Sequence, residues 1–182
     1  MTKTLRDQLI GAWKLVSHVE KPVDGSEPVY PMGEKLEGII IYAPDGYMSV
    51  HIMRPGRPKF ASGDWLSGTD KEIKEAARGY FAYSGPFHID EEKKTLTHSM
   101  FVSLDPNWLG QTQTRVVKIE GDMLHLSTEK PLESEGKETM YYLTWKRAER
   151  QSSISDVTGR TQRPRCYTQR YTSAFATAEI SA

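Results

Sequence analysis

An alternation of period two is the feature that most constrains how this chain can fold. In the run from Gly11 to Glu20 every second side chain falls on one face, beginning with Trp13, and His18 falls on the opposite, polar face. This spacing predicts a half-buried β-strand with Trp13 inside and His18 in solvent. Further strand-like runs follow at residues 36–43, 47–53, 83–90, 95–104, 112–120, 123–128 and 138–147.

The joins between these runs are turn signals, among them Pro44-Asp45-Gly46 and Glu120-Gly121-Asp122. Pro-Asp-Gly is typical of a type I turn closed by a left-handed glycine, which makes a tight hairpin with a bulge. Eight to nine short strands joined in chain order predict an all-β fold, a closed antiparallel up-and-down β-barrel.

One inserted segment has helical rather than strand spacing. Thr69 is a candidate N-cap with Glu72 three residues later, and apolar residues then recur at helical intervals up to residue 82. We expect one amphipathic helix over residues 69–82 that covers an opening or a flank of the barrel. The Pro/Gly loop before it, residues 54–65, is the candidate for a lid.

The length and the end of the chain define the domain organisation. A chain of 182 residues fits one domain, which we assign to residues 1–148. Residues 149–182 are rich in Ser, Thr, Arg and Gln and have no amphipathic period, so we expect a disordered tail there.

The composition argues against several classes of protein. Lys+Arg and Asp+Glu both number 24, so no basic excess indicates nucleic acid. Neither a signal peptide nor a membrane-spanning run is evident, and with one cysteine we expect a cytoplasmic protein that does not bind membranes. No metal-ligand spacing, phosphate loop or nucleotide fingerprint is present, so we expect neither a metal nor a cofactor, and the oligomeric state stays open.

The last strand indicates how the barrel closes. If Glu138 and Lys146 face solvent, then Tyr141 and Arg147 point inward. An inward arginine needs a partner, because burial of an unpaired charge is costly. The first and last strands of a closed barrel are neighbours, so we expect the Arg147 guanidinium to lie across the indole of Trp13 and plug the closed end.

Gly11-Ala12-Trp13 on the first strand, with a basic residue at the end of the last strand, resembles the lipocalin signature. From about residue 9 to 148 the chain is similar to the small, cysteine-poor lipocalin-like domains of bacteria and fungi. The stretches that carry the resemblance are GAWKLVS, GIIIYAPDGYMSVHIMRPGRPKF, AARGYFAYSGPFHIDEEKKTLTHSMFVSLDPNWLGQTQTRVVKIEGDMLHLST and YYLTWKRA. The resemblance implies a barrel with a ligand cavity, often near tailoring enzymes of secondary metabolism, and it implies no particular reaction.

A polar patch is expected inside this cavity. The alternation places His98 on the inner face of run 95–104, and Gln113 and Arg115 on the inner face of the next. Burial would keep His98 neutral, so it could shuttle a proton while Arg115 binds a carboxylate or enolate oxygen. The alternatives are that a hydroxyl satisfies His98 within the core, and that Asp105 or Glu138 neutralises Arg115.

Aromatic side chains form the expected walls of the site. Tyr42, Tyr83 and Tyr141 are expected inside and Trp108 at the mouth, although each could equally be a plain core or rim residue. The remaining histidines are expected outside: His88 and His125 alternate with inward residues as His18 does, whereas His51 turns inward if the register slips by one residue.

Two classes of function, and a third, fit this barrel. The first is a binder of a small hydrophobic, oxygenated metabolite within a secondary-metabolite pathway. The second is a cofactor-independent isomerase, cyclase or dehydratase that acts on a polyketide or terpenoid intermediate. The third is a scaffold or interaction module, which would have a packed interior without a cavity.

Overall fold

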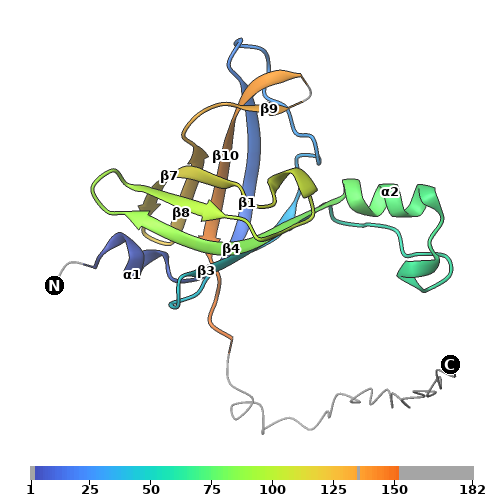
Figure 1. Ribbon diagram of the computed structural model, residues 1–182, viewed down its shortest axis with the longest axis horizontal. Coiled ribbons are helices and arrows are strands. Elements are labelled where there is room, and N and C mark those ends of the chain that lie inside the picture. Colours follow the sequence, from blue (N-terminus) through green and yellow to red (C-terminus); the bar gives the residue numbers. More distant parts are fainter. Residues whose placement is uncertain (1–2, 135, 152–182) are drawn as a thin grey trace, which may run out of the picture. The chain divides into compact units, whose positions relative to one another are not determined.

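The computed structural model describes residues 3–134 and 136–151 (Figure 1). Residue contacts divide the chain into units 1–149 and 150–182, and the helices and strands all belong to the first unit among the described residues. The tail expected over 149–182 lies, from residue 152 onward, outside the described residues. The elements are α1 (Leu5–Leu9), β1 (Gly11–Pro22), β2 (Glu37–Tyr42), β3 (Tyr47–Met53), η1 (Trp65–Ser67), α2 (Asp70–Arg78), β4 (Tyr80–Asp90), β5 (Thr95–Ser99), β6 (Val102–Ser103), η2 (Pro106–Trp108), β7 (Thr112–Glu120), β8 (Met123–Thr128), β9 (Leu132–Ser134) and β10 (Lys137–Arg147).

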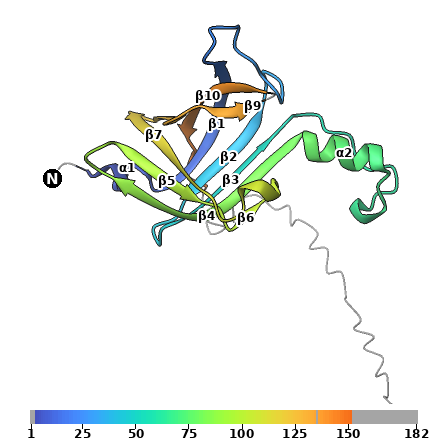
Figure 2. The same cartoon turned by 45° about the horizontal axis from the view of Figure 1, so that its top comes forward.

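The strands close into a barrel. Antiparallel pairing runs in the order β1-β2-β3-β4-β5-β7-β8-β10, and β10 pairs with β1 to complete the ring, while the short strands β6 and β9 pair at the side with β4 and β10 (Figure 2). The closed antiparallel barrel is therefore confirmed. The Pro44-Asp45-Gly46 hairpin is also confirmed, because Gly46 has φ +94° and Tyr42 pairs with Met48. This register puts His51 on the outer face, opposite Ile39.

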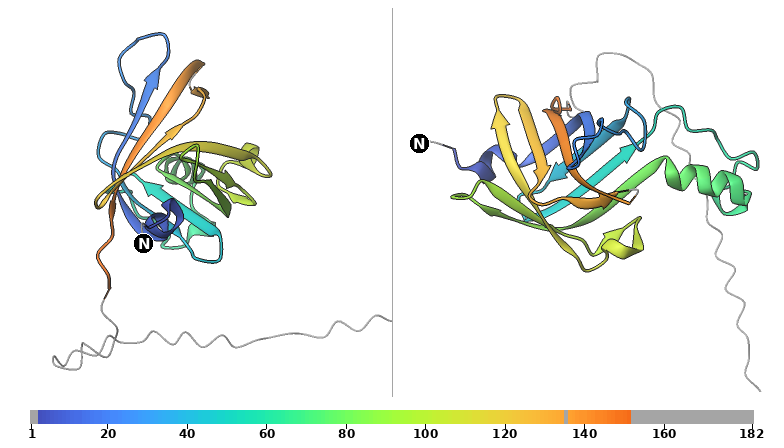
Figure 3. Two further views of the ribbon diagram at one scale, coloured as in Figure 1. Left: turned by 90° about the vertical axis from the view of Figure 1, so that its left-hand side faces the viewer. Right: turned by 90° about the horizontal axis from the view of Figure 1, so that it is seen from above.

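One end of the barrel is closed as expected. The Arg147 guanidinium lies 3.6 Å from the centroid of the Trp13 ring. Trp13 Nε1 donates to the Leu9 carbonyl over 2.8 Å, and Arg147 donates to the carbonyls of Gln8 and Ile10. These carbonyls end helix α1, which has too few residues to satisfy them itself, so the two side chains fasten α1 across this end (Figure 3).

The helical insertion is shorter than predicted and lies elsewhere. The capping box of Thr69 and Glu72 forms, but α2 ends at Arg78, and Tyr80 and Phe81 begin strand β4. The expectation that α2 covers the barrel is wrong: none of its residues is buried, and it extends outward from the first residues of β4, away from α1 (Figures 1 and 3). Loop 54–65 likewise contributes no lining residue to the cavity described below, where Pro31 and Met32 lie instead.

A β-bulge in β1 overturns the predicted orientation of His18. Leu15 pairs with Trp145 and Ser17 with Thr144, so Val16 is an extra residue with no partner of its own in the ladder. An extra residue exchanges the two faces of the strand beyond it. His18 and Glu20 therefore point into the barrel, whereas His88 is exposed as predicted.

The predicted strand over residues 95–104 is also divided. Strand β5 ends at Ser99, and Phe101 donates its backbone N–H to Ser84, so the chain crosses towards β4 and forms β6 there. Val102 and Leu104 would share the inner face with His98 if the strand continued to residue 104, but both are exposed. The crossing requires Gly85, because a Cβ at that position would overlap the Ser99 carbonyl oxygen.

Candidate functional site

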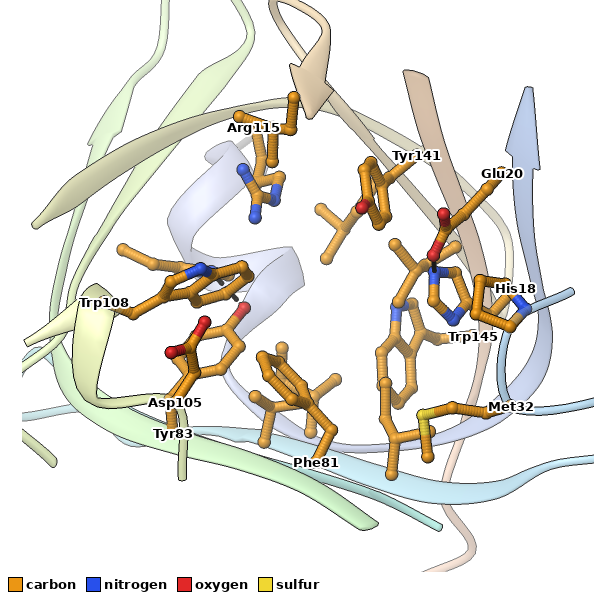
Figure 4. Close-up of a pocket in the computed structure, with 18 of the residues that line it drawn as sticks. His18, Glu20, Met32, Phe81, Tyr83, Asp105, Trp108, Arg115, Tyr141 and Trp145 are labelled. Atoms are coloured by element: carbon orange, nitrogen blue, oxygen red, sulfur yellow. Dashed lines mark hydrogen bonds and ion pairs between the residues drawn. The ribbon is translucent and has the colours of Figure 1, made fainter. Parts of the chain in front are cut away.

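A cavity of about 320 Å³ lies inside the barrel (Figure 4). Its size falls within the range of about 300–1,000 Å³ that is usual for small-molecule sites. The packed interior expected of a scaffold module is therefore absent from the described part of the chain. The apolar part of its wall includes Ile40, Val50, Ile52, Phe81 and Leu126.

His98 is held between two tyrosines on one side of this cavity. Strand β5 presents its ring inward, where it is almost fully buried. Its Nε2 lies 2.9 Å from the Tyr42 hydroxyl, and its Nδ1 lies 3.1 Å from the Tyr83 hydroxyl. Burial, helped by the charge of Arg115, puts the pKa of His98 well below its usual value, so the ring is neutral. Burial raises the pKa of both tyrosines, so both keep their protons.

The direction of these two hydrogen bonds follows from the number of protons. A neutral imidazole has one N–H and one acceptor nitrogen. Tyr42 is fully buried, and among the described residues its hydroxyl forms a hydrogen bond with His98. A buried hydroxyl proton needs an acceptor, so we assign Tyr42 as the donor to Nε2. Nδ1 then carries the proton and donates to Tyr83. The proton of Tyr83, whose side chain lines the cavity, remains available to a ligand.

Arg115 is a buried cation beside this group. Its Nη2 donates to Gln113 Oε1 over 2.6 Å and its Nη1 to the Thr114 carbonyl over 3.2 Å. Among the ion pairs of residues 3–134 and 136–151, none involves Arg115, so neither Asp105 nor Glu138 neutralises it there. A buried guanidinium without a carboxylate partner attracts a negative or partly negative oxygen.

A second polar group lies on the wall formed by β1 and β10. Of its members, the sequence predicted only Tyr141 to lie inside the barrel. The His18 ring stacks on Tyr141 at 5.8 Å, and its Nε2 lies 3.6 Å from Glu20 Oε1. Glu20 Oε2 accepts a hydrogen bond of 2.7 Å from Ser134. Burial lowers the pKa of His18 to about 4, so this ring is also neutral. Residue types alone could not reveal this group, because the bulge at Val16 decides which face is inside.

Trp108 completes the aromatic wall. Helix η2 begins where the Asp105 carboxylate accepts the backbone N–H of Asn107 over 3.0 Å, and it directs Trp108 against two rings of β4. The centroid of its ring lies 5.0 Å from that of Phe81 and 5.5 Å from that of Tyr83. Aromatic walls with a few polar groups are typical of sites for small aromatic molecules.

The candidate residues from the sequence therefore fall into two sets. Five line the cavity: Tyr83, His98, Trp108, Arg115 and Tyr141. Two lie behind it: Tyr42 bonds to His98, and Gln113, half-buried, bonds to Arg115.

Two general features of the described residues bear on partners. They contain no group of three or more His, Cys, Asp or Glu side chains that could hold a metal ion. In the same part of the chain, none of the helices has the length and apolar character needed to cross a membrane.

Comparison with known proteins identifies a matching family and a relative. A family model described as lipocalin-like domain matches residues 10–148. The 4'-hydroxy-3'-methoxypropiophenone carrier protein ppsC of Aspergillus oryzae is 44% identical over 109 residues, which are 57% of this chain and 98% of the relative.

Proposed function

The chain belongs to the lipocalin-like domain family, and on that premise we propose that it carries a small, oxygenated aromatic ketone inside its barrel without converting it. The relative's name says that it carries an aryl ketone with hydroxy and methoxy groups. The observation that carries the proposal is the meeting of two donors, the Tyr83 hydroxyl and the Arg115 guanidinium, on one wall of the cavity.

A carbonyl oxygen suits these two donors. It has two lone pairs, one for each donor, and it carries no full charge that would have to be desolvated on entry. The aromatic ring attached to it would lie against Trp108 and Phe81. Arg115 also lowers the pKa of Tyr83 by its charge and by a hydrogen bond, which opposes the effect of burial and makes that hydroxyl a better donor.

The arrangement of His98 favours carriage over catalysis. Both of its ring nitrogens are already bonded to tyrosines, so it has no free lone pair to accept a proton from a ligand. It acts on the cavity through Tyr83, whose hydroxyl it orients.

A second candidate function rests on the same three residues. If Tyr83 passes its proton to a ligand, and its oxyanion is stabilised by His98 Nδ1–H and the Arg115 cation until the proton returns, the site could isomerise, cyclise or dehydrate a polyketide or terpenoid intermediate. In that case His98→Gln should lower turnover by about a hundredfold and largely spare binding.

Titration of the protein with 4'-hydroxy-3'-methoxypropiophenone tests the proposal. Trp108 and Trp145 line the cavity, so their fluorescence should change on binding at a ratio of one to one. Propylbenzene, which lacks the oxygens, is the control and should bind more weakly. Recovery of the ketone unchanged after long incubation supports carriage, a new product supports the second candidate, and no binding contradicts both.

We further propose that the pathway is one of secondary metabolism and that the protein works in the cytoplasm. Support for the pathway comes from the named cargo of the relative, and support for the location comes from the single cysteine of the chain. Native mass spectrometry of the protein purified from its own source should show a co-purifying aromatic metabolite. A lipid or a peptide in that place would argue against this setting.

A further inference from the structure

We propose that the cavity has a second recognition end, at Trp145 and His18, which binds a hydroxyl oxygen on the far side of the ligand's ring. This inference rests on the proposed function and deepens it. The ligand class becomes an aromatic molecule with an acceptor oxygen at one end and a hydroxyl at the other, rather than any aryl ketone.

The indole nitrogen of Trp145 carries the first part of the argument. This side chain is 1% exposed and lines the cavity, yet Nε1 has no hydrogen-bond acceptor among the described residues. Trp13 is equally buried, and its Nε1 donates to the Leu9 carbonyl. Buried polar groups are almost always paired, so an N–H left unpaired at the wall of a cavity indicates a ligand acceptor.

His18 supplies the second part. Its Nε2 is also buried and has no hydrogen-bond partner in the described part of the chain. Glu20 Oε1 lies 3.6 Å away, which is too far for a hydrogen bond. Burial keeps the ring neutral at neutral pH. A hydroxyl group can satisfy both nitrogens. Its oxygen accepts a hydrogen bond from Trp145 Nε1–H, and the same hydroxyl forms a second hydrogen bond with His18 Nε2, as donor or acceptor according to which ring nitrogen of His18 carries the proton.

The two ends lie on opposite walls of the cavity. Figure 4 shows Tyr83 and Arg115 on the side formed by β4 and β7, and Trp145 and His18 on the side formed by β10 and β1. The apolar ring of Phe81 forms the part of the wall that lies between the two groups. A flat aromatic ring therefore fits between the ends, with one oxygen directed to each.

Two probes that differ only at the far end test this arrangement. The wild-type protein should bind 4'-hydroxyacetophenone about five- to tenfold more tightly than acetophenone, the usual gain from one hydrogen bond. Trp145→Phe should reduce that difference to about twofold or less, because the hydroxyl loses the indole donor. Trp13→Phe removes an indole N–H that is already bonded, so it is the matched control and should retain the difference.

Indole signals of the ¹⁵N-labelled wild-type protein give a second readout that does not depend on a folded variant. One buried indole N–H should shift with 4'-hydroxyacetophenone and not with acetophenone. Equal affinities of the wild type for both probes, or an equal loss of both in Trp145→Phe, would overturn the second end while the proposed function stands. If neither probe binds, both proposals fail.

Discussion

Arg115→Met should separate ligand affinity from folding stability. Methionine has a similar length but neither charge nor donors. The change removes the hydrogen bonds to Gln113 and Thr114, and charged hydrogen bonds contribute about 1.5–3 kcal/mol each. It also removes a buried charge without a carboxylate partner in the described residues, and burial of such a charge costs several kcal/mol. We therefore expect the free energy of unfolding to stay the same or to rise by about 1 kcal/mol.

The same substitution should weaken ligand binding. The ligand would lose one charged hydrogen bond to its carbonyl oxygen, about 1.5–3 kcal/mol. This corresponds to a rise in Kd of about 10- to 150-fold. Urea denaturation and calorimetric titration with 4'-hydroxy-3'-methoxypropiophenone, on one preparation, give both quantities.

Lys118→Met is the matched control on the same strand. Lys118 is exposed and forms an ion pair of 2.9 Å with Glu120, and exposed pairs contribute at most about 1 kcal/mol. Its binding should equal that of the wild type. If Arg115→Met instead lowers the free energy of unfolding by more than about 2 kcal/mol and leaves affinity unchanged, Arg115 is structural and does not bind the carbonyl oxygen of the ligand.

Three further predictions concern the barrel itself. Arg147→Met should lower the free energy of unfolding, measured by urea denaturation, by about 3 kcal/mol, because it removes a desolvated cation–π contact and two hydrogen bonds to carbonyls. A loss below about 1 kcal/mol would contradict the assignment of the closed end. Between pH 7 and pH 5, His18 takes up a proton in the unfolded chain but not in the folded chain, where its pKa is about 4. The free energy of unfolding should therefore fall by about 2 kcal/mol from this residue as the pH is lowered, and His18→Gln should remove that part of the pH dependence. Gly85→Ala should prevent folding or lower the melting temperature severely, because the new methyl group overlaps the Ser99 carbonyl; a melting temperature within a few degrees of the wild type would show that β5 can move away.

Where local chemistry determines structure, the sequence predicted it. The hairpin at Pro44-Asp45-Gly46 needs a glycine with positive φ, and the chain has one at that position. The contact of Arg147 with Trp13 followed from two facts, an inward charge and the adjacency of the first and last strands in a closed barrel.

The second end of the cavity could not be predicted, because a bulge depends on pairing between distant strands. Val16 is an ordinary strand residue, and only its lack of a partner on β10 makes it extra. That single residue moves His18 and Glu20 from solvent into the barrel. The end of β5 at Ser99 has a similar origin, since it depends on the close approach of Gly85 from another strand.

The most direct test of the central claim is a crystal structure of the protein with 4'-hydroxy-3'-methoxypropiophenone. We expect the ketone inside the barrel, with its carbonyl oxygen within hydrogen-bond distance of the Tyr83 hydroxyl and the Arg115 guanidinium, and its phenol oxygen at Trp145 Nε1. A ketone bound outside the barrel, or bound inside with its carbonyl away from both Tyr83 and Arg115, would contradict it.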